Sequence, residues 1–220
     1  MSERIDIYDE LMRPLGTKSR SEVHQEGHWH KAFHCWLVSV GKTGGADDGL
    51  LLFQRRSASK DIGGNTLDIS AAGHLEAGEK PLDGLRELDE ELGVRVESEK
   101  LKFLGVYVEV YRDPKIVNRE FDYVYLLRED KELGDYRVEP EEVTGLTQVR
   151  LADGIALFSE GVAEIECESV VFDDKGRPNG APFKERVGID AFLGGKRNNY
   201  FIKMFLLARG FLSGEEHLFI

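Results

Sequence analysis

The stretch Gly73-His74-Leu75-Glu76-Ala77-Gly78-Glu79, followed shortly by Arg86-Glu87-Leu88-Asp89-Glu90-Glu91-Leu92-Gly93-Val94, decides how this chain is understood. It places a glycine-containing loop before a helix dense in carboxylates. At about 3.6 residues per turn, Glu87, Glu90 and Glu91 project from one face of that helix. Like charges at this spacing repel, but they become ligands when a hard divalent cation lies among them. The stretch therefore predicts a cation site built on a helix.

The boundaries of this helix follow from its end signals. Proline near the start and Gly93 after the last periodic residue are typical of the two ends of a helix, which we expect from about Pro81 to Leu92. A short strand around Leu67 to Ala71 precedes the loop. The expected local order is strand, loop, helix.

Composition limits the class of protein. With 41% hydrophobic and 32% charged residues, the 220-residue chain is an ordinary globular protein, which we expect to form a single domain over residues 1–220. A formal net charge of -12 argues against a nucleic-acid polymer as partner. An anionic substrate would need a metal or local arginines. Cys35 and Cys167, far apart and without a CxxC partner, predict reduced thiols.

The chain shows no sign of a membrane partner. No stretch approaches the roughly 18 apolar residues needed to cross a bilayer, and residues 1–6 lack the apolar region of a signal peptide. We therefore expect a cytoplasmic protein, and we leave open whether it forms a homodimer.

Strands alternate irregularly with a few helices, which predicts an α+β domain with a mixed sheet. The turn signal Asp113-Pro114 separates two aromatic-rich strands, and residues 160–198 are expected to form a hairpin insertion before a C-terminal helix. The remaining expected strands are 29–40, 50–54, 101–111, 121–128 and one near Gln148, and the remaining expected helices are 151–159 and 199–209.

The residues match the signature of the Nudix hydrolases. That signature is a glycine, five residues, Glu, seven residues, Arg-Glu, an aliphatic, any residue, Glu-Glu, any residue, Gly and an aliphatic. The Nudix box here spans residues 73–94 and departs once, because six residues, Lys80 to Leu85, follow Glu79 instead of seven. We place the missing residue where the loop joins the helix, since the spacing is kept from Arg86 onward.

The resemblance implies a fold, a cofactor and a reaction. The fold would be an α/β/α sandwich with a mixed sheet. The cofactor would be Mg²⁺ or Mn²⁺, and the reaction would be cleavage, by water attack at phosphorus, of a diphosphate linked to another group, such as a nucleoside or prenyl diphosphate. Glu87, Glu90 and Glu91 resemble the metal ligands. Arg86 and Glu79 resemble the pair that ties the helix to the loop at Gly73.

The chain is also similar to one branch of this family, the isopentenyl-diphosphate isomerase-like proteins and their hydrolase relatives. This similarity covers roughly residues 5–150. The matching segments are Val23-His24, His30 to Leu37, Gln54 to Lys60, Ser70 to His74 and Asn118 to Phe121. In the isomerases, the positions of His24, His30, His74 and Glu120 resemble a second metal site, and Arg56 and Lys60 lie in a segment that contacts the substrate diphosphate.

Histidine spacing alone supports a weaker interpretation. On a strand, His28, His30 and His34 would share one face, and such histidines are more often half-buried polar residues than ligands. With the resemblance, His24, His30 and His74 become candidates for a second metal or for substrate contact. We expect Glu90, Glu120 and Arg86 to be the catalytic residues, with Glu90 or Glu120 as general base.

Departures from the isomerase pattern favour hydrolysis. Isomerising an alkene requires adding and removing a proton, for which the isomerases use a cysteine, a glutamate and a supporting tryptophan. The corresponding residues here are Ala72, Asn118 and Leu67. The alternatives are an isomerase that uses another acid and a non-catalytic Nudix-fold binding module, and the latter predicts loss of box carboxylates. We therefore expect a hydrolase acting on a small-molecule diphosphate.

Overall fold

The structure is a computed structural model that describes residues 3–60, 62–112, 116–195 and 199–220. The turn predicted at Asp113-Pro114 lies outside the described residues. The strands are β1 Arg4–Tyr8, β2 Pro14–Ser19, β3 Trp29–Ser39, β4 Leu50–Arg56, β5 Leu67–Asp68, β6 Ala71–His74, β7 Lys102–Arg112, β8 Val117–Arg128, β9 Val143–Arg150, β10 Glu164–Val171 and β11 Phe183–Gly188. The α-helices are α1 Arg20–Glu26, α2 Arg86–Leu92, α3 Leu151–Ile155 and α4 Asn199–Leu212.

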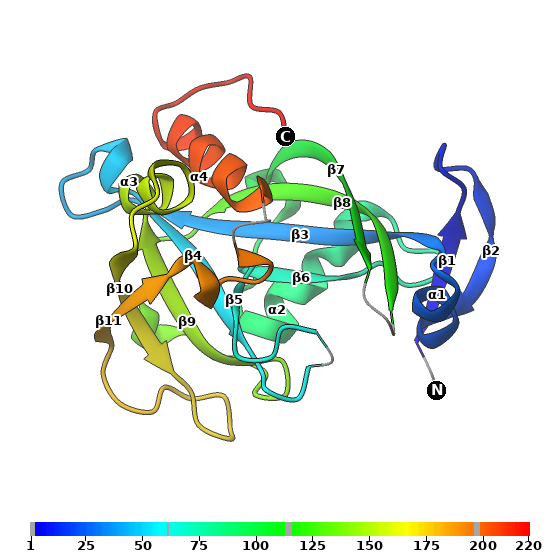
Figure 1. The fold of residues 1–220 in the computed structure, drawn as a ribbon, viewed down its shortest axis with the longest axis horizontal. Helices are drawn as coiled ribbons and strands as arrows, with labels where there is room; N and C mark the ends of the chain where they lie inside the picture. Colours follow the sequence, from blue (N-terminus) through cyan, green and yellow to red (C-terminus); the bar gives the residue numbers. More distant parts are fainter. Residues whose placement is uncertain (1–2, 61, 113–115, 196–198) are drawn as a thin grey trace.

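One mixed sheet organises the molecule, with β3 near its centre (Figure 1). β3 pairs in parallel with β8 over ten residue pairs, from Trp29↔Arg119 to Val38↔Arg128, and the other strand pairs are antiparallel. β7 extends the sheet beyond β8, while β4, β9, β10 and β11 extend it in the other direction. The predicted α+β class with a mixed sheet is confirmed.

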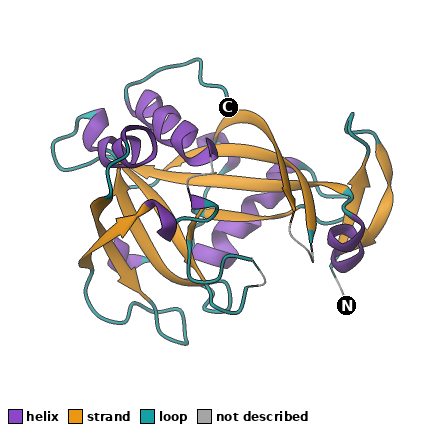
Figure 2. Ribbon diagram, viewed as in Figure 1, coloured by secondary structure: helices purple, strands orange, loops and turns teal. Residues whose placement is uncertain are grey.

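Helices cover both faces of this sheet (Figure 2). Successive side chains of a strand point to opposite faces, and β3 shows this directly. Trp36 and Val38 pack in one core with Phe201 and Phe205 of α4. Phe33, Cys35 and Leu37 pack in the other core with Leu88 and Leu92 of α2. The sheet therefore separates two apolar layers, as expected for an α/β/α sandwich.

Several predicted elements need correction. The helix expected from Pro81 is a 3₁₀ helix, η2 (Pro81–Leu85), before α2 begins at Arg86. The strand expected over 67–71 is two short strands, β5 and β6, which pair with different neighbours. The C-terminal helix continues to Leu212. The segment expected as the helix 151–159 is the short α-helix α3 followed by a π-helix, η5 (Ala156–Glu160).

The hairpin expected within 160–198 is formed by β10 and β11, which pair from Glu164↔Gly188 to Ser169↔Phe183. β10 also pairs with β9, so the hairpin continues the main sheet. The N-terminal β1–β2 pair and α1 were not predicted. None of the described helices is long and apolar enough to cross a membrane.

Candidate active site

A split in the sheet creates the candidate active site. β3 and β4 pair only at Val38↔Leu51 and Ser39↔Leu50, and then diverge. β6 pairs with β3 and β5 pairs with β4 inside this gap. Because β6 leads directly into the loop before α2, the split places the carboxylates of α2 against the diverging strands.

Arg86 ties the loop to the helix. Its Nε donates to Glu79 Oε1 at 3.0 Å, and its Nη2 donates to the backbone carbonyl of His74 at 2.9 Å. Its Nη1 donates to Glu87 Oε1 at 2.5 Å and to Glu90 Oε2 at 3.2 Å. Burial lowers the pKa of Arg86, but Glu79 and the nearby carboxylates outweigh this effect and raise it. One guanidinium thus neutralises several acids and fixes the loop on the helix.

The short spacer after Glu79 has a structural explanation. A 3₁₀ helix has about 3.0 residues per turn and an α-helix about 3.6. Six residues wound mostly as η2 therefore make about two turns, as seven do in an α-helix. Gly93 ends α2 in the left-handed conformation, with φ of 62°. The pair Arg86–Glu79 forms despite the missing residue.

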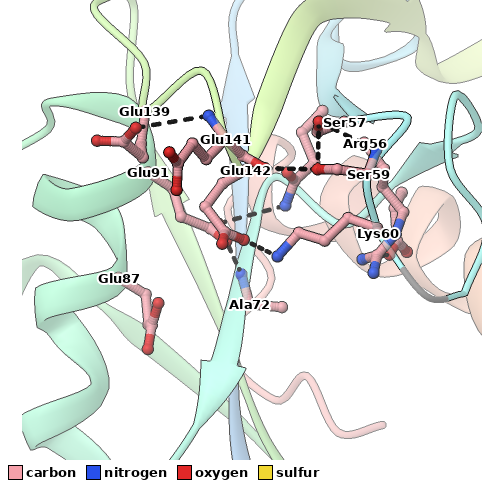
Figure 3. Close-up of polar contacts among 12 residues, drawn as sticks. Arg56, Ser57, Ser59, Lys60, Ala72, Glu87, Glu91, Glu139, Glu141 and Glu142 are labelled. Carbon is pink, nitrogen blue, oxygen red and sulfur yellow. Dashed lines mark hydrogen bonds and ion pairs between the residues drawn. The ribbon is translucent and has the colours of Figure 1, made fainter.

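Glu87 and Glu91 are the buried carboxylates of α2 (Figure 3). The Glu91 carboxylate accepts hydrogen bonds from the backbone N–H of Ala72 at 3.2 Å and from Gln54 Nε2 at 3.3 Å. A Cβ on Gly73 would lie 2.1 Å from Glu87 Oε1, so any larger residue there would displace the Glu87 carboxylate. Burial, and then the neighbouring Glu87, raises the pKa of Glu91 to about 8. Burial also raises the pKa of Glu87.

Glu90 differs from its two neighbours. Its side chain is 59% exposed and interacts with Arg86, so the three helix acids do not share one buried face. This corrects the expectation that Glu87, Glu90 and Glu91 project from one face of the helix. The reason is that Glu87 and Glu91, four residues apart, face β6, while Glu90 lies on the flank of the helix.

Basic side chains lie on the other side of Glu91. Arg56 Nη1 donates to Asp68 Oδ2 at 2.8 Å, and its Nε donates to the carbonyl of Ile62 at 3.1 Å. Lys60 forms an ion pair with Glu142, and burial and Arg56 lower the pKa of Lys60 (Figure 3). Both cations favour ionised Glu91. Arg55 points elsewhere, to Glu185, with a separation of 2.7 Å.

Three histidines meet at the start of β3. The ring centroids of His24, His30 and His74 are 4.9–5.2 Å apart, and each ring offers a nitrogen within 4.8 Å of the others. Glu120 Oε1 lies 3.3 Å from His30 Nε2 and 3.2 Å from His74 Nε2. The buried Nε2 of His24 has no hydrogen-bond partner. Histidine nitrogens and a carboxylate that converge in this way fit a divalent transition metal.

Charge in the histidine group is divided unevenly. Burial, and then His74 and His30, lowers the pKa of His24 to about 4. Burial also lowers the pKa of His74, but hydrogen bonds to Glu120 and Glu3 outweigh it and raise the value to about 8. Burial raises the pKa of Glu120, but hydrogen bonds and charge from His30 and His74 outweigh it and hold the pKa well below its usual range. Asn118 Nδ2 also donates to Glu120 Oε2 at 2.5 Å.

The expected row of histidines on β3 is only partly correct. His28 precedes β3 and interacts with Glu26, 2.7 Å away. His34 lies farther along the strand, where its Nδ1 is 3.1 Å from the Tyr200 hydroxyl. Only His30 joins the cluster, because His24 comes from α1 and His74 from β6.

Two residues beside Glu91 were missed by the sequence analysis. Gln54 is buried on β4, and Glu142 lies just before β9. Gln54 was included only as part of a matching segment, and Glu142 lies in an acidic turn typical of a solvated loop. Pairing of β4 with β9, at Arg56↔Val143, is what brings Glu142 to the site.

The chain is similar in sequence to known proteins. The NUDIX domain model matches residues 28–162. An uncharacterized Nudix hydrolase of Clostridium acetobutylicum is 36% identical over 176 residues, which cover 80% of this chain and 83% of that protein. The chain belongs to the Nudix family.

Two further relatives bear on the branch of the family. Nudix hydrolase 3 of Arabidopsis thaliana is 37% identical over 67% of this chain, which corresponds to 19% of that longer protein. An isopentenyl-diphosphate Delta-isomerase of Serratia proteamaculans is 29% identical over 57% of this chain and 66% of the isomerase. Among solved structures, a Deinococcus radiodurans protein matches with a TM-score of 0.51 and 24% identity, over 72% of this chain and 90% of its own. That likeness concerns the fold.

Proposed function

We propose that this protein is a divalent-metal-dependent Nudix hydrolase that cleaves a diphosphate linked to another group. The observation that carries the proposal is the buried pair Glu87 and Glu91 beside Gly73, with Arg56 and Lys60 near Glu91. The two buried acids can bind a divalent cation, and the two basic side chains near Glu91 can bind phosphate. A divalent cation on the acids, together with a diphosphate bound by Arg56 and Lys60, would satisfy both groups.

The α2 carboxylates fit a hard cation. Glu87 and Glu91 would hold Mg²⁺ or Mn²⁺. Glu90 shares Arg86 Nη1 with Glu87, so a change of rotamer would let Glu90 join these two ligands. When bound, such a cation neutralises charge on a phosphoryl group and lowers the pKa of water. Arg86 competes for the same oxygens of Glu87 and Glu90, which gives metal binding a local cost.

Arg56 and Lys60 would bind the diphosphate. Arg56 is oriented by Asp68 and by the Ile62 carbonyl, so its guanidinium is held in place before substrate arrives. Lys60 would exchange Glu142 for a phosphate oxygen, because both offer anionic acceptors.

Two carboxylates can act as general base. His30 and His74 hold the pKa of Glu120 well below its usual range, but its oxygens already have partners in these histidines and Asn118. Glu90 is exposed and paired only with Arg86 among the described contacts. Loss of kcat without loss of metal binding, in Glu90→Gln or in Glu120→Gln, would identify the base. His24, His30 and His74 would hold a second metal or contact the substrate.

Isomerisation is the rival reaction, and the similarity to an isomerase together with the histidine group keeps it as an alternative. Ala72, in the position of the isomerase cysteine, has a methyl side chain, so this position offers no thiol. Leu67, in the tryptophan position, is fully buried in the core. Protonation of a carbon would need another acid.

The deciding experiment is a panel of nucleoside and prenyl diphosphates incubated with Mg²⁺, with phosphate release and product identity both measured. Free phosphate from at least one member supports hydrolysis. Conversion of isopentenyl diphosphate to dimethylallyl diphosphate, with no phosphate from any member, would establish the isomerase instead. A binding module would bind a diphosphate without either product.

A further inference from the structure

A second group of acids lies beside the histidines, on strands β7 and β8. Glu109 of β7 pairs with Glu120 of β8, and Asp122 follows two residues along β8, so the three side chains share one face of the sheet. Each offers a carboxylate oxygen, and these oxygens all lie within 4.8 Å of one another. None of them belongs to α2.

Asp122 shows that this group is built for a ligand. The residue is 0% exposed, and neither of its carboxylate oxygens has a hydrogen-bond partner. The nearest described basic atom, His34 Nε2, is 3.8 Å from Asp122 Oδ1, too far for a hydrogen bond. A buried carboxylate that lacks both hydrogen bonds and a counter-charge is strongly unfavourable.

The residues that pair with Asp122 on the neighbouring strands supply no positive charge. Ala32, which pairs with Asp122 on β3, contributes no polar group, and Tyr107, which pairs with Asp122 on β7, stacks on Tyr200 with ring centroids 4.6 Å apart. Glu109 is only half-buried, so the group is reachable from its side of the sheet. Converging carboxylate oxygens are the ligands preferred by hard divalent cations.

We propose that Glu109, Glu120 and Asp122 form an oxygen-ligand site for a divalent cation of the Mg²⁺ or Mn²⁺ type. Glu120 also contacts His30 and His74, so this residue would be shared with the histidine group. If the histidines hold a metal, as proposed above, Glu120 bridges two cations. The carboxylate site itself rests neither on that assignment nor on the hydrolase reaction.

The test counts bound Mn²⁺ by electron paramagnetic resonance, in which free Mn²⁺ is measured as the full chain is titrated. The background is Glu87→Gln combined with Glu91→Gln, which removes the α2 ligands. In this background, adding Asp122→Asn should remove about one Mn²⁺ per chain. Glu109→Gln should weaken the same site by about tenfold or more. Glu185→Gln, a half-buried acid paired with Arg55, is the control and should leave the count unchanged.

Thermal unfolding with EDTA separates lost binding from lost folding. Asp122→Asn exchanges one unpartnered buried polar side chain for another of the same shape, so the metal-free variant should melt close to its parent, and its melting temperature should rise less with Mn²⁺. An unchanged Mn²⁺ count in both Asp122→Asn and Glu109→Gln would overturn the proposal. No measurable Mn²⁺ in the parent background would overturn it as well. Failure of the hydrolase proposal would instead appear as absent phosphate release, whatever the count.

Discussion

Glu91 accepts a hydrogen bond from the backbone N–H of Ala72, with Oε2 and N 3.2 Å apart. A strand of the split sheet therefore orients the most buried carboxylate of the Nudix helix. The Ala72 methyl group packs instead against the core cluster that contains Trp36 and Phe201. Strand β6 thus holds the α2 carboxylate through a backbone N–H.

The close approach of β6 to α2 predicts the effect of Gly73→Ala. The added Cβ would lie 2.1 Å from Glu87 Oε1, so Glu87 must move. We expect a loss of about 1–3 kcal/mol in the free energy of unfolding and weaker Mg²⁺ binding. Gly134→Ala, where a Cβ would meet nothing within 4 Å, is the control. Equal Mg²⁺ affinity in the two variants, measured by calorimetry, would show that Glu87 is not a ligand.

Arg86→Lys tests the link between loop and helix. A lysine cannot donate at once to Glu79, to the His74 carbonyl and to Glu87. We expect a destabilisation of about 1–3 kcal/mol, measured by urea denaturation. Arg95→Lys, which changes an exposed pair with Asp89, should cost much less. Equal losses in the two variants would contradict the account.

The raised pKa of Glu91 predicts how the metal-free protein responds to pH. The pKa of Glu91 is about 8 in the folded protein and about 4.3 in the unfolded chain. The folded state therefore binds more protons than the unfolded state between these pH values. The free energy of unfolding should therefore fall as pH rises from about 4.3 to 8, by on the order of a few kcal/mol. Glu91→Gln should flatten this slope in EDTA, and Asp89→Asn should not. The same slope in Glu91→Gln and in the parent would refute this explanation.

Lys60→Gln tests the diphosphate contact. Removing the ammonium should raise KM for a hydrolysed diphosphate by about tenfold, with a smaller change in kcat, if Lys60 binds the ground state and the transition state alike. Lys184→Gln, an exposed lysine paired with Glu166, is the control. If KM in Lys60→Gln stayed within the range of the control, Lys60 would be a structural partner of Glu142 alone.

The loop and acidic helix could be predicted from sequence because their signals are local. The spacing of Glu87 and Glu91, the stop at Gly93 and the pair Arg86–Glu79 all lie within one segment. Exposure of Glu90 and the 3₁₀ turn of η2 could not be predicted, because they depend on how that segment packs against β6.

Contacts between distant segments were harder to predict. The Glu109 group depends on the register of β7 against β8, which is irregular between Phe103 and Gly105, and side-chain alternation shifts at that point. Hydrogen bonding of His34 to Tyr200 joins strand β3 to the last helix. On α4, Met204 and Ala208 are buried while Leu206 is exposed, and this face is set by how the helix packs on the sheet.

Hydrolysis by the α2 carboxylates is tested by phosphate release with Mg²⁺ from whichever diphosphate the parent cleaves. It is measured for Glu91→Gln and for Asp89→Asn, a half-exposed acid on the same helix. We predict that Glu91→Gln loses about 100-fold or more in kcat/KM while Asp89→Asn stays within about twofold of the parent. Full activity in Glu91→Gln would contradict the account.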